Sequence, residues 1–175
     1  MKKFFGKNII PWNEALRLDA LYYYDLLNDL PDRYFANLAH IIAITFNTPI
    51  ALVTLVGKNS VLYKGNAGME GTNEADRGIS LCSLAILEAE PTVFEDALKE
   101  PCLLTNPLVA GSFGLRFYAG APITTPAGYN IGTVCIVDKK PRLFSENESE
   151  ILTRFAASAM YEIEMRKSIQ PVSLP

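Results

Sequence analysis

The spacing of apolar positions predicts a long first helix. Residues 12–30 carry apolar side chains at intervals of three and four, and Asn13 is placed to cap the helix at its start. The expected buried face consists of Leu16, Ala20, Tyr23, Leu27 and Leu30. A second apolar face consists of Leu18, Tyr22 and Leu26. A helix that is apolar on two faces should pack against two partners, for example its own sheet and another subunit.

A second helix and a strand hairpin follow. Pro31 interrupts the first pattern, and Asp32 can cap a helix over residues 33–46. The expected buried face of this helix consists of Phe35, Leu38, Ile42 and Phe46. Residues 50–56 are rich in β-branched side chains and predict a strand, which a short Gly-Lys-Asn turn connects to a returning strand over residues 60–68.

The segment that follows this hairpin is long and mostly irregular. Residues 69–78 contain charges and turn residues without an apolar period, which predicts a loop. Ser80 is placed to cap a short helix over residues 81–89, and residues 92–96 predict a short strand. Residues 97–114 contain two prolines and should be irregular. A long ordered loop in a compact domain is often functional.

A second hairpin and a final helix complete the chain. Residues 115–125 and 130–138 predict two strands joined by a turn that contains Gly128, and Ser145 with Glu148 forms a capping box at the start of the last helix. The apolar stripe of that helix consists of Ile151, Leu152, Phe155, Ala159 and Ile163. This order predicts an α+β fold with a largely antiparallel central sheet. The N- and C-terminal helices should pack on one face of the sheet and the long loop with its short helix on the other.

Composition and charge narrow the class of protein. The chain has 175 residues, which fits one domain, with 49% hydrophobic and 20% charged residues. No apolar run approaches the ~20 residues that cross a bilayer, and the start lacks the pattern of a signal peptide. We therefore expect a cytoplasmic protein that binds no membrane. The net charge of −3 and the short, mixed basic clusters argue against a nucleic-acid partner.

The cysteines and the histidine indicate no metal site and no catalytic group. The three cysteines, Cys82, Cys102 and Cys135, include no C-x-x-C pair and are expected to be reduced thiols. His40 is the only histidine, and the sequence marks no partner that would make it a catalytic base. No cofactor is indicated.

Several motifs are similar to those of GAF domains in bacterial signalling proteins. They are "ISLC" at 79–82, "EDAL" at 95–98, "RFYAGAP" at 116–122, the pattern G-x-x-x-G-T-x-C-x-x-D at 128–138, and "KPR" at 140–142. The resemblance covers almost the whole chain, from Asn13 to Arg166, and the combination is specific. It implies a single GAF domain over residues 13–167, with an N-terminal extension at 1–12 and a C-terminal tail at 168–175.

The resemblance implies a GAF-like (PAS-like) fold with a pocket between the sheet and the long loop. Such domains are typically small-molecule sensors or dimerisation modules. We therefore expect a non-catalytic module that binds an unidentified small molecule and forms a homodimer through its terminal helices, with a signalling protein as a further partner. Two alternatives stay open: a thiol-dependent reductase of the free methionine-sulfoxide type, and a dimerisation scaffold without a ligand. Leu84 stands where this group often has histidine, so no role of that histidine is expected here.

The run "RFY" supplies the first candidate ligand contacts. Strand alternation places Arg116 and Tyr118 on one face and Phe117 on the other. If the first face looks toward residues 69–114, a guanidinium and a phenol can meet an anionic or aromatic ligand, and Gly120 leaves room. Alternatively, Arg116 pairs with an acid such as Asp96, and Tyr118 simply fills the core.

The remaining candidates surround the same expected pocket. Cys82 lies at the start of a short helix, where its thiol could be reactive or touch a ligand, although a small buried residue is the more common role. Phe94, Asp96 and Tyr63 complete the candidate ligand-binding set with Arg116 and Tyr118. Cys135 alternates within a β-branched strand and is expected to be buried and inert, and Cys102 is expected to be the most exposed thiol.

Overall fold

A computed structural model of the protein describes residues 3–4, 7–26 and 32–169. The helices are α1 (Glu14–Tyr23), α2 (Arg33–Phe46), α3 (Cys82–Ala85), the 3-10 helix η1 (Ala97–Lys99), α4 (Pro107–Ala110) and α5 (Glu146–Ile169). The strands are β1 (Lys3–Phe4), β2 (Lys7–Asn8), β3 (Ile50–Val56), β4 (Ser60–Ala67), β5 (Glu74–Asp76), β6 (Thr92–Phe94), β7 (Phe117–Thr124) and β8 (Asn130–Asp138).

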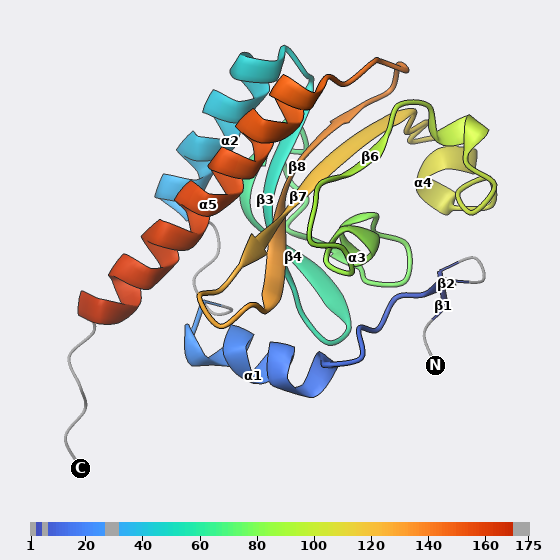
Figure 1. The fold of residues 1–175 in the computed structure, drawn as a ribbon. Coiled ribbons are helices and arrows are strands. Elements are labelled where there is room, and N and C mark those ends of the chain that lie inside the picture. The colour runs from blue at the N-terminus through green and yellow to red at the C-terminus, as the bar shows by residue number, and fades with distance from the viewer. Residues whose placement is uncertain (1–2, 5–6, 27–31, 170–175) are drawn as a thin grey trace.

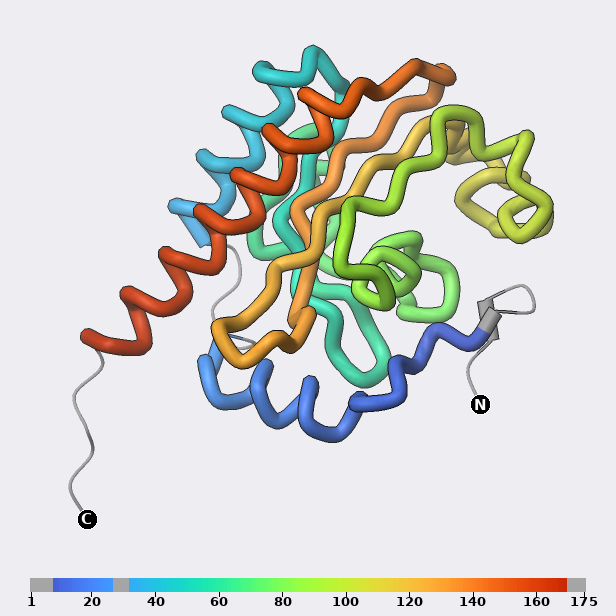
Figure 2. The backbone as a smooth tube through the Cα atoms, in the orientation of Figure 1, coloured from blue at the N-terminus to red at the C-terminus, as the bar shows by residue number. Residues whose placement is uncertain are grey.

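A six-stranded antiparallel sheet in the order β5-β4-β3-β8-β7-β6 forms the centre of the molecule. Helices α2 and α5 cover one face of this sheet (Figure 1). Residues 69–114, which we call the excursion, supply the two edge strands β5 and β6, and their short helices and loops lie on the other side of the sheet (Figure 2). The predicted α+β architecture is therefore confirmed, except for the place of the first helix. Helix α1 lies across one end of the sheet instead of packing beside α5.

Helix α1 is shorter than predicted and buries a different face. It ends at Tyr23, and Asp25 has a left-handed backbone with φ of 52°. The side chains of Leu16 and Tyr23, expected inside, are exposed, whereas Arg17 and Leu21 are buried. The spacing of apolar residues predicted the wrong buried face because Arg17, which is paired with Glu14, occupies a core position. Asn13 occupies the cap position without a side-chain hydrogen bond, and predicted positions Leu27, Leu30 and Pro31 lie outside the described residues.

The ends of the other elements are mostly as predicted. Asp32 caps α2, with its carboxylate accepting from the amides of Tyr34 and Phe35. At α5, the Ser145 amide donates to the Glu148 carboxylate and the Glu148 amide donates to the Ser145 hydroxyl, which confirms the capping box. The predicted loop at 69–78 contains the edge strand β5, and the short helix α3 covers only four residues, without a cap bond from Ser80.

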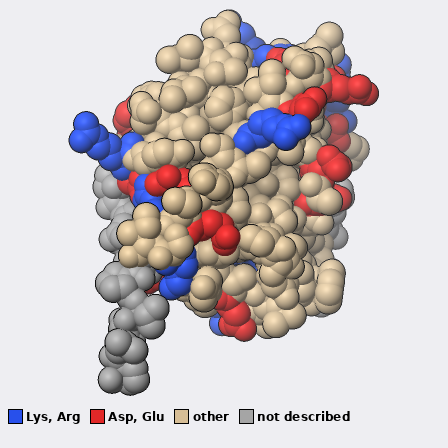
Figure 3. Space-filling view, turned by 60° about the vertical axis from the view of Figure 1, so that its left-hand side comes forward, with Lys and Arg blue, Asp and Glu red and all other residues tan. Residues whose placement is uncertain are grey.

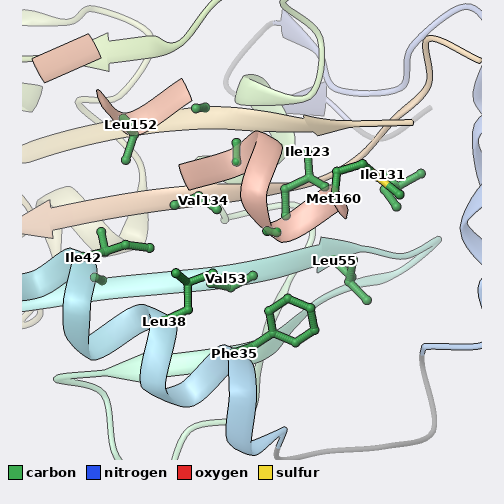
Figure 4. Close-up of a cluster of buried hydrophobic side chains, with 14 of the residues drawn as sticks. Phe35, Leu38, Ile42, Val53, Leu55, Ile123, Ile131, Val134, Leu152 and Met160 are labelled. Atoms are coloured by element: carbon green, nitrogen blue, oxygen red, sulfur yellow. The ribbon is translucent and has the colours of Figure 1, made fainter. Parts of the chain in front are cut away.

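Side-chain alternation along the central strands builds two hydrophobic cores. On the helical face, Val53 and Leu55 of β3 and Val134 of β8 pack with the apolar stripes of α2 and α5 (Figure 4). On the opposite face, Leu52 and Cys135 pack with the excursion. The central strands are buried on both faces, which explains their nearly continuous apolar sequence.

A cluster of buried charges holds α1 and the excursion to the end of the sheet. Glu14 accepts hydrogen bonds from the guanidinium groups of Arg17 and Arg77, which are almost fully buried. Arg17 also donates to the carbonyl of Val56, and Arg77 donates to the carbonyls of Gly57 and Ile9. One carboxylate thus links three segments that are far apart in the chain.

This cluster should depend strongly on the charge of Glu14. Burial alone would raise the pKa of this carboxyl, but the hydrogen bonds from Arg17 and Arg77 lower it overall. We predict that Glu14→Gln costs about 3–5 kcal/mol of unfolding free energy at pH 7 in urea titrations, because it leaves buried guanidinium groups without a counter-charge. Since the folded-state pKa is depressed, the cost should be present above the unfolded pKa and should fade as pH falls through the folded pKa.

The matched control is Glu150→Gln. Glu150 forms an ion pair with Arg154 on the exposed surface of α5, and such pairs contribute about 0–1 kcal/mol. Equal costs for the two substitutions would contradict the structural role of the Glu14 cluster.

Candidate functional site

A small cavity lies between the sheet and the excursion. Its volume is about 40 Å³. The lining residues from the sheet are Leu52, Tyr63, Tyr118, Cys135 and Val137, and those from the excursion are Met69, Ser80, Leu81, Cys82, Leu108 and Phe113. Leu115, which directly follows the excursion, also lines the cavity. None of these lining side chains is charged. The site therefore offers apolar contacts with a few hydroxyl and thiol groups.

Gly120 explains how Tyr118 reaches this cavity. The two residues lie on the same face of β7, and a Cβ atom at position 120 would lie 2.2 Å from the Tyr118 hydroxyl oxygen. The ring therefore lies along the strand in the space that glycine leaves free. From the sequence we expected Gly120 to leave room for a ligand. In the structure the ring of Tyr118 itself occupies that volume. Ala119 and Ala121 face the helical core instead.

Two cysteines from distant parts of the chain meet beside this ring. Cys135 pairs with Gly120 in the sheet register, and Cys82 begins α3 above it. Their sulfur atoms lie 3.8 Å apart, and both residues are buried. A hydrogen bond from Cys135 lowers the pKa of the Cys82 thiol against the effect of burial, while the same contact and burial raise the pKa of Cys135. The Tyr118 hydroxyl is buried, and among the described residues it has no hydrogen-bond partner of normal geometry.

Three of the six predicted site residues line the cavity: Tyr63, Cys82 and Tyr118. Phe94 contacts the ring of Tyr118, with centroids 6.3 Å apart, but does not line the cavity. Phe117 faces the helical core, as strand alternation predicts.

Arg116 and Asp96 are not part of the cavity. The Arg116 guanidinium donates two hydrogen bonds to the Asp96 carboxylate, at 3.0 and 3.1 Å, and its side chain is partly exposed. The alternative of a paired arginine is therefore the one that the geometry supports. The expectation that Arg116 meets an anionic ligand in the pocket is wrong for this conformation, because Asp96 already neutralises it outside.

Sequence reasoning missed nine of the twelve lining residues, and among these Cys135, Ser80 and Phe113 add a thiol, a hydroxyl and an aromatic ring to the cavity. Only Cys135 had a usable signal, since a residue on the outer face of a strand beside "RFYAG" should neighbour Tyr118. Ser80 and Phe113 belong to irregular backbone, where no periodicity predicts the direction of a side chain.

Comparison with known proteins identifies relatives over most of the chain. The GAF domain family matches residues 31–163. A cyclic di-GMP phosphodiesterase of Pseudomonas aeruginosa is 31% identical over 151 residues, which are 86% of this chain and 26% of the relative. The chain thus spans about a quarter of the length of that curated relative.

Solved structures show the same fold at low sequence identity. The GAF domain of a phosphoenolpyruvate-protein phosphotransferase from Acinetobacter superposes with a TM-score of 0.65 at 16% identity, covering 90% of this chain and 98% of that one. A free methionine-R-sulfoxide reductase from Neisseria meningitidis has a TM-score of 0.64 at 17% identity, covering 88% and 92%. At these identities the likeness establishes the fold alone.

The contact between Tyr118 and Gly120 generates a prediction. Gly120→Ala should destabilise the protein by about 1–3 kcal/mol in urea denaturation, because the added methyl displaces the Tyr118 ring into a packed site. In a Tyr118→Ala background the same substitution should cost much less, since the clashing atoms are gone. Additive costs in this double-mutant cycle would show that the two side chains do not compete for the same space.

Proposed function

Because the chain belongs to the GAF domain family, we propose that it is a non-catalytic sensory module that binds a small molecule and signals through a dimer. The observation that supports this most directly is the cavity between the sheet and the excursion, which the side chain of Tyr118 lines. Family membership over residues 31–163 supports a sensory or regulatory role. We do not propose the activity of the longer Pseudomonas relative for this chain, because the chain matches only part of that protein.

The chemistry of the cavity favours a small neutral ligand with an aromatic or apolar body. A buried anion would find no lysine, arginine or histidine among the lining residues and would lose its hydration without compensation. Ligand sites usually measure ~300–1,000 Å³, so binding of a metabolite requires the excursion to move outward. Leu108 of α4 and Phe113, which precedes Gly114, line the cavity from the excursion, and Gly114 has φ of 68°.

The same features argue against the reductase alternative. Free methionine sulfoxide carries an ammonium and a carboxylate, and the lining residues include no Asp, Glu, Lys, Arg or His to supply counter-charges. The small volume instead favours the scaffold alternative as the second candidate, in which the domain acts through dimerisation without a ligand.

Exposed apolar side chains on the helices support a dimer. Tyr161 and Met165 of α5 are 69% and 41% exposed, and Ile41 and Ile44 of the neighbouring α2 are also exposed. Uncharged side chains cover much of the face in Figure 3. The ammonium of Lys167 on α5 lies 4.6 Å from the ring centre of Tyr23 on α1, and this ring is exposed. The two terminal helices therefore meet near their C-terminal ends.

In the described part of the chain, no helix is both long and apolar enough to cross a membrane.

Ligand binding is tested by a thermal-shift screen of neutral aromatic fragments, such as phenol and indole, against benzoate and indole acetate. A fragment at ~100 times its dissociation constant adds about 2.7 kcal/mol, so the Tm of the protein should rise by ~5–11 °C. The charged analogues should have little effect. Tyr118→Phe should reduce the shift because it removes a polar contact, whereas Arg116→Ala should leave the shift unchanged because Arg116 lies outside the cavity.

Two outcomes would contradict this assignment. A shift that is lost in Arg116→Ala and kept in Tyr118→Phe would place the ligand at the Arg116–Asp96 pair. No shift with any fragment, in a protein that is dimeric, would support the scaffold without a ligand.

The dimer is tested by light scattering and sedimentation of the 19.3 kDa chain. We expect a mass of two chains at micromolar concentration, with an interface of more than ~1,000 Å². Tyr161→Glu or Met165→Glu should weaken association at least ~10-fold, since a charge would be buried in an apolar contact. The control is Leu143→Glu, at an 83% exposed residue outside the helices, which should leave the dimer intact. A wild-type monomer at high micromolar concentration would overturn the proposal.

A further inference from the structure

The pair of thiols beside Tyr118 is a product of the tertiary fold. Cys82 and Cys135 are 53 positions apart in the chain, yet their sulfur atoms lie 3.8 Å apart with both side chains buried. Cys135 lies on β8, which pairs with β3 on one side and β7 on the other. Cys82 lies in the excursion. A covalent bond between them would therefore join the excursion directly to the centre of the sheet.

The cavity that these thiols line has the right volume for a particular class of reactant. A water molecule needs about 10–15 Å³ of such space, so about 40 Å³ accepts a molecule the size of hydrogen peroxide. Larger oxidants, such as low-molecular-weight disulfides, do not fit without opening of the excursion. Tyr118 also lines the cavity, and its hydroxyl finds no hydrogen-bond partner of normal geometry within residues 3–4, 7–26 and 32–169.

We propose that Cys82 and Cys135 form a peroxide-sensitive dithiol, which closes to an intramolecular disulfide and pins the excursion to the sheet. This goes beyond the proposed sensory function and depends on neither a bound metabolite nor a dimer. Packing alone would not require two cysteines at these positions, and the proposal gives them a chemical role.

The reaction balances with hydrogen peroxide as the only added reactant. The Cys82 sulfur attacks one peroxide oxygen, so an S–O bond forms and the O–O bond breaks. The leaving hydroxide takes up the thiol proton as water, and Cys82 becomes a sulfenic acid. The Cys135 sulfur then attacks the Cys82 sulfur. An S–S bond forms, the S–O bond breaks, and a second water leaves with the Cys135 proton. Two thiols and one peroxide thus give one disulfide and two waters.

The surroundings of the two sulfurs favour this order of events. The hydrogen bond from Cys135 lowers the pKa of Cys82, so Cys82 is the thiol that reaches the reactive thiolate form first. Burial raises the pKa of Tyr118 well above its ordinary value. Tyr118 therefore stays protonated and can donate a hydrogen bond to the oxygen that leaves, which makes it a positioning residue for this step.

The experiment uses the full chain, purified in the reduced state and treated with one equivalent of hydrogen peroxide. Before alkylation, we expect the intact protein mass to fall by about 2 Da, since two thiols lose their hydrogens. After quenching with N-ethylmaleimide and denaturation, the number of alkylated thiols should fall from three to one. Peptide mass spectrometry should identify a Cys82–Cys135 link that dithiothreitol reverses. The melting temperature should rise by about 5–15 °C, because the bond closes a long loop.

Variants separate this chemistry from general oxidation. Cys102→Ser should keep the disulfide, because Cys102 does not line the cavity. Cys135→Ala should instead leave a sulfenic acid on Cys82 that dimedone traps. Tyr118→Phe should slow disulfide formation about tenfold or more without changing which cysteines are linked. The wild-type measurement requires no variant, so a misfolded mutant does not weaken the test.

Two results would overturn the proposal. They are three free thiols after ten equivalents of peroxide, and a disulfide that contains Cys102. The ligand screen and the dimer measurement are made on the reduced protein, so failure of the proposed function and failure of the dithiol are distinguishable.

Discussion

The register of the three central strands is the constraint on which the rest of the molecule depends. In the pairing of β3, β8 and β7, Cys135 is opposite both Leu52 and Gly120. Because side chains alternate across a sheet, a slip of one residue in any of these strands would exchange the two faces. Val53 and Val134 would leave the helical core, and Cys135 would leave the cavity. The packing of both faces thus fixes one register, and that register builds the site.

The two faces of the sheet are covered by different kinds of structure. On the helical face, Ala119 and Ala121 lie among larger apolar side chains of α2 and α5, so short and long side chains interdigitate. On the excursion face, irregular backbone replaces helices, and single polar contacts hold it. The side-chain amide of Asn106, for example, donates to the carbonyl of Ile79. Irregular backbone fills the space above the sheet less completely, and the cavity beside Tyr118 is the volume that remains.

Buried ion pairs hold the helices at both ends of this arrangement. Glu14 joins α1 to Arg77 in the excursion, and Asp32 joins the start of α2 to Arg166 near the end of α5. The Arg166 guanidinium also lies 5.0 Å from the ring centre of Phe35, a core residue of α2. The end of α5 therefore contacts the helical core. A partner that displaced α5 would also disturb the side chains of α2 that pack on the sheet.

Local pattern in the sequence was sufficient for much of the fold. The periodicity of residues 33–46 and the capping box at Ser145 determined α2 and the start of α5, and alternation placed Phe117 and Tyr118 on opposite faces. These features succeed because they depend on residues within one turn or one strand. The family resemblance carried over the position of the pocket, because a common fold preserves the space between the sheet and the excursion.

Only the tertiary structure decided which side chains meet. Arg17 is buried because the carbonyl of Val56 and the carboxylate of Glu14 accept hydrogen bonds from its guanidinium group, and an apolar periodicity does not reveal such partners. Arg116 turned to Asp96 and away from the cavity, and Cys82 came to lie against Cys135. These contacts join residues 20 to 53 positions apart, so they depend on strand register and on the path of irregular backbone, for which a linear pattern of apolar and polar residues contains no signal.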